Sequence, residues 1–234
     1  MLSAADFRVQ KLTASGFIAT EGFDPSAALK HVLRNWSEVY DGQITSLPLP
    51  PEAPPDFPSV SVSSKDGAWQ VEMSRKRVNL VWARRDGSNP QLGSTFSELA
   101  ARLVTIIEGE EAALGRLAAL VTRTTPLDEP GRVLARQFCQ GKWLRGPLNR
   151  PEGFELHAHK TFSLLRGLMV NSWVRVKTAK AGSPEYRYVT VEQDINTLAE
   201  ELETRRFNHR EAGKMFAAAS RELNAILRMY FPAS

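Results

Sequence analysis

Apolar and polar positions follow two different periods along this chain, and the period changes from segment to segment. Strict alternation is typical of a strand that is buried on one face, whereas an apolar residue every three or four positions indicates an amphipathic helix. Alternation predicts strands at residues 7–20, 59–64, 68–74, 77–84, 116–124, 154–165, 168–178 and 186–195. Helical spacing predicts helices at residues 23–40, 95–107, 127–144 and 207–231.

Local signals mark where the predicted helices begin. A polar side chain just before the first turn accepts from free backbone N–H groups, and a Glu three residues later completes a capping box. Proline is tolerated at the first helical position. We therefore expect helices to begin at Asp24 with Pro25, Thr95 with Glu98, Asp128 with Pro130, and Asn208 with Glu211.

The order of the predicted elements is strand, helix, three strands and helix, and this order occurs twice. We therefore predict an α+β protein of two such halves, residues 1–114 and 115–234, with antiparallel sheets and helices on one face. The halves share no obvious sequence identity, and they could also form one continuous domain. Helices on one face leave the opposite face of the sheet open.

Alternation in the last three strands predicts which side chains lie on that open face. They are the side chains of Glu155, His157, His159, Thr161, Asn171, Trp173, Arg175, Lys177, Tyr188, Thr190, Glu192 and Asp194. If the three strands are neighbours, histidines, carboxylates, bases and aromatic rings gather on one surface. This collection is richer than a solvated face requires.

A binding face is the interpretation we favour. Trp, Tyr and Arg are enriched in protein interfaces, and this surface offers them together with an amide at Asn171, Trp173, Arg175 and Tyr188. We therefore predict a non-enzymatic binding or accessory protein. It would act through a protein partner, or by self-association as a homodimer.

An enzyme is the first alternative, either metal-dependent or a hydrolase with a His/carboxylate pair. His157 and His159 lie two residues apart and could converge with Glu155 on a transition-metal ion. Metal-free acid/base chemistry would use the same histidines with Asp194. Two histidines alone are a weak ligand pattern, so we predict no metal and no cofactor. The sequence also contains no GxxxxGK[ST], GxGxxG or GxSxG motif.

Nucleic-acid binding is the second alternative. The chain has 30 Lys and Arg against 26 Asp and Glu, a formal charge of +4 and a pI of about 9.3. A dedicated nucleic-acid-binding protein usually gathers its bases in a stripe, whereas here they are scattered among acids. The charge therefore permits a nucleic-acid partner without favouring one.

The sequence predicts a cytoplasmic protein with no membrane partner. Its single cysteine, Cys139, cannot form an intrachain disulfide. The first residues lack the basic and then apolar pattern of a signal peptide. No apolar window approaches the roughly 20 residues of a membrane span.

Three stretches resemble a sporadically distributed bacterial family of uncharacterised proteins. They are "QVEMSRKRVNLVWAR" followed by "FSELAARLVTII", then "RLAALVTR", and "VEQDINTL" before the last helix. The family carries Tyr and Asn in the central strand and a second Asp in the late strand, where this chain keeps Asp194 and has Asn196. The resemblance follows the order of elements over most of the chain. It implies a fold and a bacterial setting, and it transfers no catalytic residue.

Overall fold

The computed structural model describes residues 1–50, 52–85, 87, 89–182 and 186–233. Its helices are α1 (Pro25–Trp36), α2 (Leu92–Glu108), α3 (Pro130–Phe138), α4 (Gly141–Leu144) and α5 (His209–Tyr230). Its strands are β1 (Arg8–Ile18), β2 (Ile44–Ser46), β3 (Val60–Ser63), β4 (Trp69–Met73), β5 (Arg77–Ala83), β6 (Leu114–Pro126), β7 (Glu155–Leu165), β8 (Leu168–Ala181) and β9 (Tyr186–Thr197). No helix within these ranges is long and apolar enough to cross a membrane.

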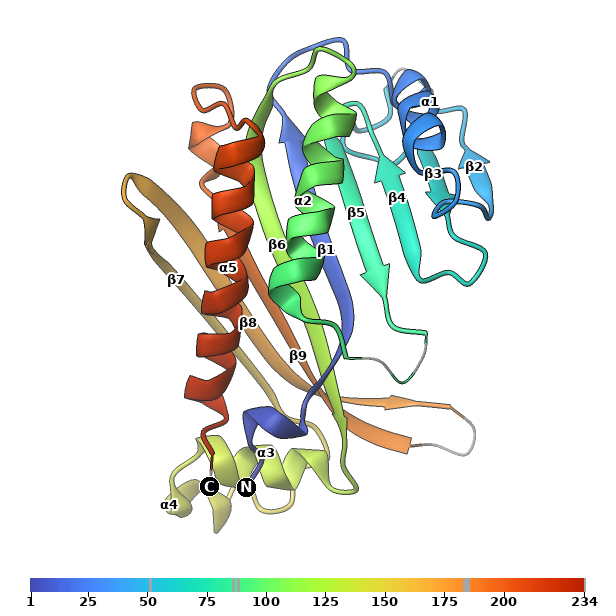
Figure 1. Cartoon of the computed structure of the whole chain (residues 1–234). Coiled ribbons are helices and arrows are strands. Elements are labelled where there is room, and N and C mark those ends of the chain that lie inside the picture. The colour runs from blue at the N-terminus through green and yellow to red at the C-terminus, as the bar shows by residue number, and fades with distance from the viewer. Residues whose placement is uncertain (51, 86, 88, 183–185, 234) are drawn as a thin grey trace.

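All the strands of the described ranges form one antiparallel sheet (Figure 1), in the order β2-β3-β4-β5-β1-β6-β9-β8-β7. The predicted α+β class is confirmed. The order of elements differs from the prediction in two places: the first half has a fourth strand after its first helix, the short β2 that pairs with β3, and the helix expected at 127–144 is divided into α3 and α4. β1 and β6 pair at the centre, from Arg8 with Thr124 to Ile18 with Leu114. The first strand of each half therefore joins the two halves into one sheet.

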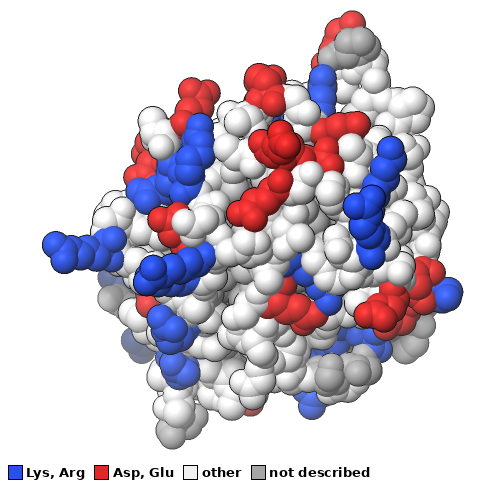
Figure 2. Space-filling view, turned by 45° about the horizontal axis from the view of Figure 1, so that its top comes forward, with Lys and Arg blue, Asp and Glu red and all other residues white. Residues whose placement is uncertain are grey.

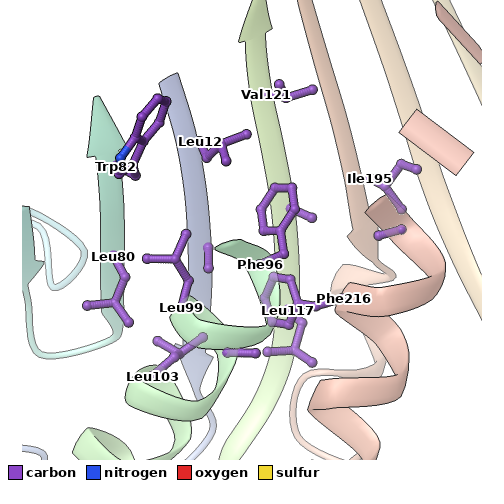
Figure 3. Packing of buried hydrophobic residues seen from close by; sticks show 14 of the residues in the cluster. Leu12, Leu80, Trp82, Phe96, Leu99, Leu103, Leu117, Val121, Ile195 and Phe216 are labelled. Carbon is purple, nitrogen blue, oxygen red and sulfur yellow. The ribbon is translucent and has the colours of Figure 1, made fainter. Parts of the chain in front are cut away.

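The main core lies between the sheet and the two long helices. α2 and α5 pack against each other on one face of the sheet. Phe96 of α2 and Phe216 of α5 are fully buried, and their rings stack with centroids 5.8 Å apart. Figure 3 shows the two rings among side chains of four strands, Leu12, Leu80, Leu117 and Ile195. Each buried aromatic or aliphatic side chain contributes roughly 1.5–3 kcal/mol, so this contact fixes both helices to one face.

Two of the four predicted helix starts are confirmed. The Asp24 side chain accepts from Ser26 N with Pro25 as the first helical residue. Asn208 and Glu211 form the predicted capping box of α5. These motifs work as predicted because each involves only residues of one turn.

The other two helix starts differ from the prediction. α2 begins at Leu92, three residues before Thr95, and no side chain caps it. Glu98 instead pairs with Arg102, whose guanidinium lies 4.9 Å from the ring centroid of Trp69. The start of α3 has Pro130 in its predicted place, but Glu129 occupies the cap position expected for Asp128. Because α2 begins one turn earlier than predicted, Thr95 and Glu98 lie inside the helix, and Glu98 forms an i,i+4 pair with Arg102 instead of a capping box.

One charged side chain lies inside the core beneath α5. Arg123 of β6 is 2% exposed, and burial lowers its pKa to about 10. Its guanidinium donates to Gln193 Oε1 and, at 2.9 Å, to Asn224 Oδ1. Both acceptors are neutral amides, so hydrogen bonds rather than a counter-ion hold this charge. Such a group is costly when a partner is removed.

We predict that Asn224→Ala lowers the free energy of unfolding by about 1.5–3 kcal/mol, the range for a hydrogen bond to a charged group. The loss arises because the buried guanidinium keeps its charge and loses one acceptor. Urea unfolding measures this loss. The matched control is Asn35→Ala, at an exposed position of α1, which should change stability by no more than about 0.5 kcal/mol. Equal losses in both variants would contradict the buried-charge account.

Candidate functional site

The last three strands are neighbours in the sheet, and β6 adds a fourth strand beside them. We call the side of β6–β9 that faces away from α2 and α5 the open face. Successive cross-strand rows run over this face, because side chains in register share one side of a sheet. The central row joins His159, Trp173, Asp194 and Leu120. The side chains predicted for the open face therefore lie beside one another on neighbouring strands.

Trp173 is the most prominent apolar side chain of the open face. Its side chain is 48% exposed, yet its ring stacks on His159 with centroids 4.0 Å apart and planes 19° from parallel. His159 is held in turn by Asn171, whose Oδ1 lies 3.1 Å from His159 Nε2. The indole is therefore both exposed and fixed. Since His159 covers its β7 side, its other face is turned toward β9.

The next two rows, one with His157, Arg175 and Glu192 and the other with Glu155 and Lys177, carry charges that are already paired. Glu155 Oε1 lies 2.5 Å from Arg175 Nε and 2.7 Å from His157 Nε2. Hydrogen bonds from His157 and Arg175 hold the pKa of Glu155 below its usual value. Lys177 Nζ lies 2.7 Å from Glu192 Oε1. The bases of these two rows are therefore neutralised by acids of the neighbouring row.

A hollow of about 330 Å³ lies between these rows. Its lining includes Trp173 on one side, Leu120 on the other, and Asp194 between them. Strands are about 4.8 Å apart, so the backbones of β8 and β6 lie about 10 Å apart across β9. This spacing leaves room for one flat group against the free indole face.

Asp194 has an unusual environment at this hollow. Its Oδ1 is buried and accepts no hydrogen bond from any described residue. Burial raises the pKa of Asp194, while Asn196 and Arg116 partly offset that rise. Arg116 makes its own hydrogen bonds to Thr197 O and Asn196 Oδ1, each at 2.8 Å. One oxygen of the Asp194 carboxylate thus has no hydrogen-bond partner among the described residues, and the group has no close cationic partner of the kind that Glu155 and Glu192 have.

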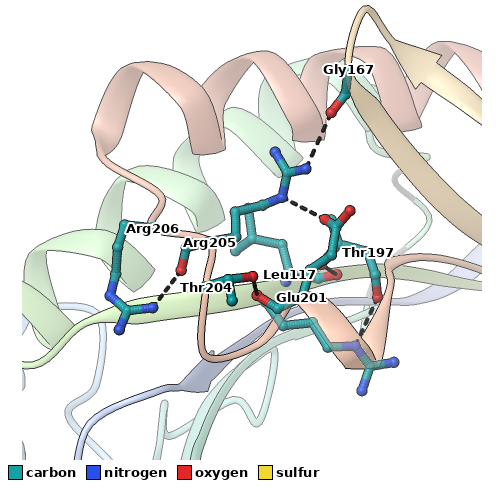
Figure 4. A network of polar contacts seen from close by, with 8 residues as sticks. Leu117, Gly167, Thr197, Glu201, Thr204, Arg205 and Arg206 are labelled. Carbon is teal, nitrogen blue, oxygen red and sulfur yellow. Dashed lines mark hydrogen bonds and ion pairs between the residues drawn. The ribbon is translucent and has the colours of Figure 1, made fainter.

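A polar network fixes the ends of the strands that form the open face (Figure 4). Arg205 donates to Glu201 at 2.5 Å and to Gly167 O, in the β7–β8 turn, at 3.1 Å. Thr197 accepts from Arg116 through its carbonyl, and its Oγ1 accepts from Leu117 N at 3.0 Å. The β7–β8 turn is therefore tied to the segment before α5, and the end of β9 is tied to β6.

The structure does not bring the predicted acid/base residues into one cluster. His157 contacts Glu155, His159 contacts Asn171, and the two imidazoles have separate partners. Asp194 lies on β9, two strands from β7, so the backbones are about 10 Å apart. In the part of the chain that is described, no group of three or more His, Cys, Asp or Glu side chains is placed to hold a metal ion.

The predicted binding residues divide between two places. Trp173, Arg175 and Asn171 lie together around the hollow or beside it. Tyr188 lies six residues along β9 from Asp194, about 20 Å away, with its ring 5.7 Å from that of Tyr186. Leu120 completes the hollow and was not predicted from the sequence. Its alternation within "RLAALVT" was visible, but the pairing of β6 with β9 was not.

Comparison with known proteins finds no protein-family model and no curated protein that matches this chain. The resemblance to an uncharacterised bacterial family therefore stays a prediction.

We predict that Asp194→Asn stabilises the protein at pH 7. A raised pKa in the folded state means that folding favours protonated Asp194, so this contribution is present below about pH 4 and is lost as pH rises through the folded-state pKa. The neutral amide of the Asp194→Asn variant would carry no charge, so the unfavourable burial of an ionised carboxylate at pH 7 is removed. The gain in melting temperature should therefore be largest at pH 7 and shrink toward pH 4.

Glu72→Gln is the matched control for this substitution. Glu72 accepts hydrogen bonds from Gln70 and Asn79 at 3.2 and 3.3 Å, so its carboxylate is satisfied and no gain is expected. A destabilised Asp194→Asn variant at pH 7 would contradict the environment described for Asp194.

Proposed function

We propose that this chain is a binding protein whose open face docks a protein partner. The observation that carries the proposal is Trp173, which is half exposed yet fixed against His159. A large aromatic side chain held in one orientation loses little entropy on binding, and Trp is the residue type most enriched among interface hot spots. A solvated sheet face has no need of such a side chain.

The surroundings of Trp173 support this proposal. Hot spots are surrounded by polar groups that exclude water without contributing much energy. The Glu155–Arg175 and Lys177–Glu192 pairs border the hollow and are neutralised within the chain. A partner covering them would meet little uncompensated charge. The hollow beside the indole offers a place for one inserted side chain.

The partner is either another protein or a second copy of this chain. A homodimer through the open face would be symmetric, with Trp173 of each copy near the two-fold axis or inserted into the hollow of the other. Both arrangements use the same surface. The oligomeric state of the purified protein therefore decides between them and leaves the role of the open face unchanged.

Photo-crosslinking tests whether the open face binds a protein. We place a photoreactive amino acid at Thr161, an exposed open-face position two residues from His159, and at Met229, which is 74% exposed on α5. We expect a discrete cross-linked species, heteromeric or homodimeric, from position 161 and none from position 229. Cross-linking from position 229 alone would overturn the proposal.

Affinity measurements with the purified partner give the quantitative test. Trp173→Ala should weaken binding by at least about 10-fold, as expected for a central aromatic contact. Met229→Ala is the control and should leave the affinity unchanged. An unchanged affinity in the Trp173→Ala variant would show that the contact surface lies elsewhere.

Nucleic-acid binding is a second candidate, because the structure contains a separate basic and aromatic groove. A cavity of about 1170 Å³ lies where β1 begins and β6 ends, lined in part by Arg8, Gln10, Arg84, Tyr186 and Tyr188. Tyrosine rings beside arginines can stack on the bases of a single strand and contact its phosphates. On the face seen in Figure 2, by contrast, acidic and basic side chains are interspersed without a basic stripe.

Fluorescence anisotropy with a labelled single-stranded oligonucleotide tests this second candidate. Binding should weaken steeply with salt, and Arg8→Ala should reduce the log–log slope by about 0.7 if Arg8 contacts a phosphate. Tyr186→Ala should cost about 1–3 kcal/mol if a base stacks there. Binding that responds to neither substitution would exclude this groove as the site.

A further inference from the structure

We propose that the hollow between Trp173 and Leu120 receives an arginine side chain of the protein partner, whose guanidinium stacks on the indole and donates to Asp194. This inference rests on the proposed function of the open face and names the chemistry of the contact. Three features of the described residues lead to it. They are the vacant acceptor, the free indole face and the pairing of the neighbouring charges.

The first feature is the unbonded acceptor oxygen of Asp194. Buried polar atoms in folded proteins are nearly always hydrogen-bonded, and an exception needs an explanation. Asp194 Oδ1 is buried without a partner in the described chain. The same residue is half-buried and lines the hollow. A rotation about χ2 would bring the unbonded oxygen toward a donor in the hollow. A donor group entering the hollow would supply the missing hydrogen bond.

The walls favour a flat cation. Trp173 is covered by His159 on its β7 side, so the indole face toward Asp194 is free for stacking. Guanidinium groups stack on aromatic rings and also present several N–H donors in one plane. The opposite wall is Leu120, which can pack against the aliphatic part of an arginine side chain. A lysine ammonium group is not planar, so it could not stack on the indole in the same way.

The charges around the hollow also favour a cationic arginine side chain. Arg175 is compensated by Glu155, and Glu192 is compensated by Lys177. Arg116 interacts with Asp194 only at longer range, and its guanidinium is bonded to Thr197 and Asn196 and lies 4.5 Å from the ring centroid of Phe17. Asp194 is therefore the carboxylate of this hollow with capacity for a further cation.

The test uses N-acetyl-arginine methylamide as the probe and N-acetyl-citrulline methylamide as its neutral, nearly isosteric counterpart. The indole N–H signals of the ¹⁵N-labelled full chain report binding, and the Trp173→Phe variant identifies the signal of Trp173 among the five tryptophans. We expect a saturable shift of the Trp173 signal with the arginine probe. Citrulline should bind at least about 10-fold more weakly.

Two variants test whether binding of the arginine probe depends on the Asp194 carboxylate or only on the overall charge of the surface. Asp194→Asn keeps the shape of the side chain and should lower the affinity for the arginine probe by at least about 10-fold, while its melting curve shows that it remains folded. Glu72→Gln, on β4 outside the hollow, should bind like the native chain. Equal binding of arginine and citrulline, unchanged binding by Asp194→Asn, or no saturable shift at all would each overturn the proposal.

The outcome can be read separately from that of the proposed function. Suppose that the partner cross-links from position 161 and that Trp173→Ala lowers the affinity for the partner, but Asp194→Asn does not. The open face then binds protein without an arginine in the hollow. If the arginine probe binds and no cross-link forms from position 161, the hollow recognises guanidinium but the open face is not a protein interface.

Discussion

The pairing of β1 with β6 is the contact on which the rest of this structure depends. Each half of the chain contributes its first strand, and the two strands run antiparallel through the middle of the sheet. Their helix-side residues, including Leu12 and Leu117, lie beneath the contact between Phe96 and Phe216 (Figure 3). One pairing therefore aligns both halves, so that α2 and α5 cover the same face and the other face remains open.

An open face of this length has to satisfy its own polar groups. Across β7–β9 it does so by rows of cross-strand partners, from the Glu155–Arg175 pair to the contact of His159 with Asn171. Within this self-contained network two groups stand apart, the exposed indole of Trp173 and the unbonded oxygen of Asp194. They lie side by side in one cross-strand row, and neither has a purely structural explanation. This coincidence gives the open face its proposed role.

The sequence predicts most of the fold, because its signals are local. Period-two alternation correctly divided the residues of the predicted strands 154–165, 168–178 and 186–195 between the two faces. The cap at Asn208 was correct because it involves one helical turn. The Thr95–Glu98 capping box was wrong because α2 begins at Leu92, so that both residues lie inside the helix and Glu98 pairs with Arg102 one turn later. Leu120 could not be assigned to the hollow, since that requires knowing that β6 pairs with β9. The unbonded Oδ1 of Asp194 is likewise a property of packing, which no spacing reveals.

Hydroxyl-radical footprinting of the free and partner-bound protein tests the central claim most directly, because it reports the exposure of individual side chains. Trp173 on the open face and Met229 on α5 are both oxidisable and exposed in the free chain, at 48% and 74%. The account predicts that the partner protects Trp173 strongly and leaves the oxidation of Met229 unchanged. Protection of Met229 with unchanged oxidation of Trp173 would place the partner on the helices and contradict the account.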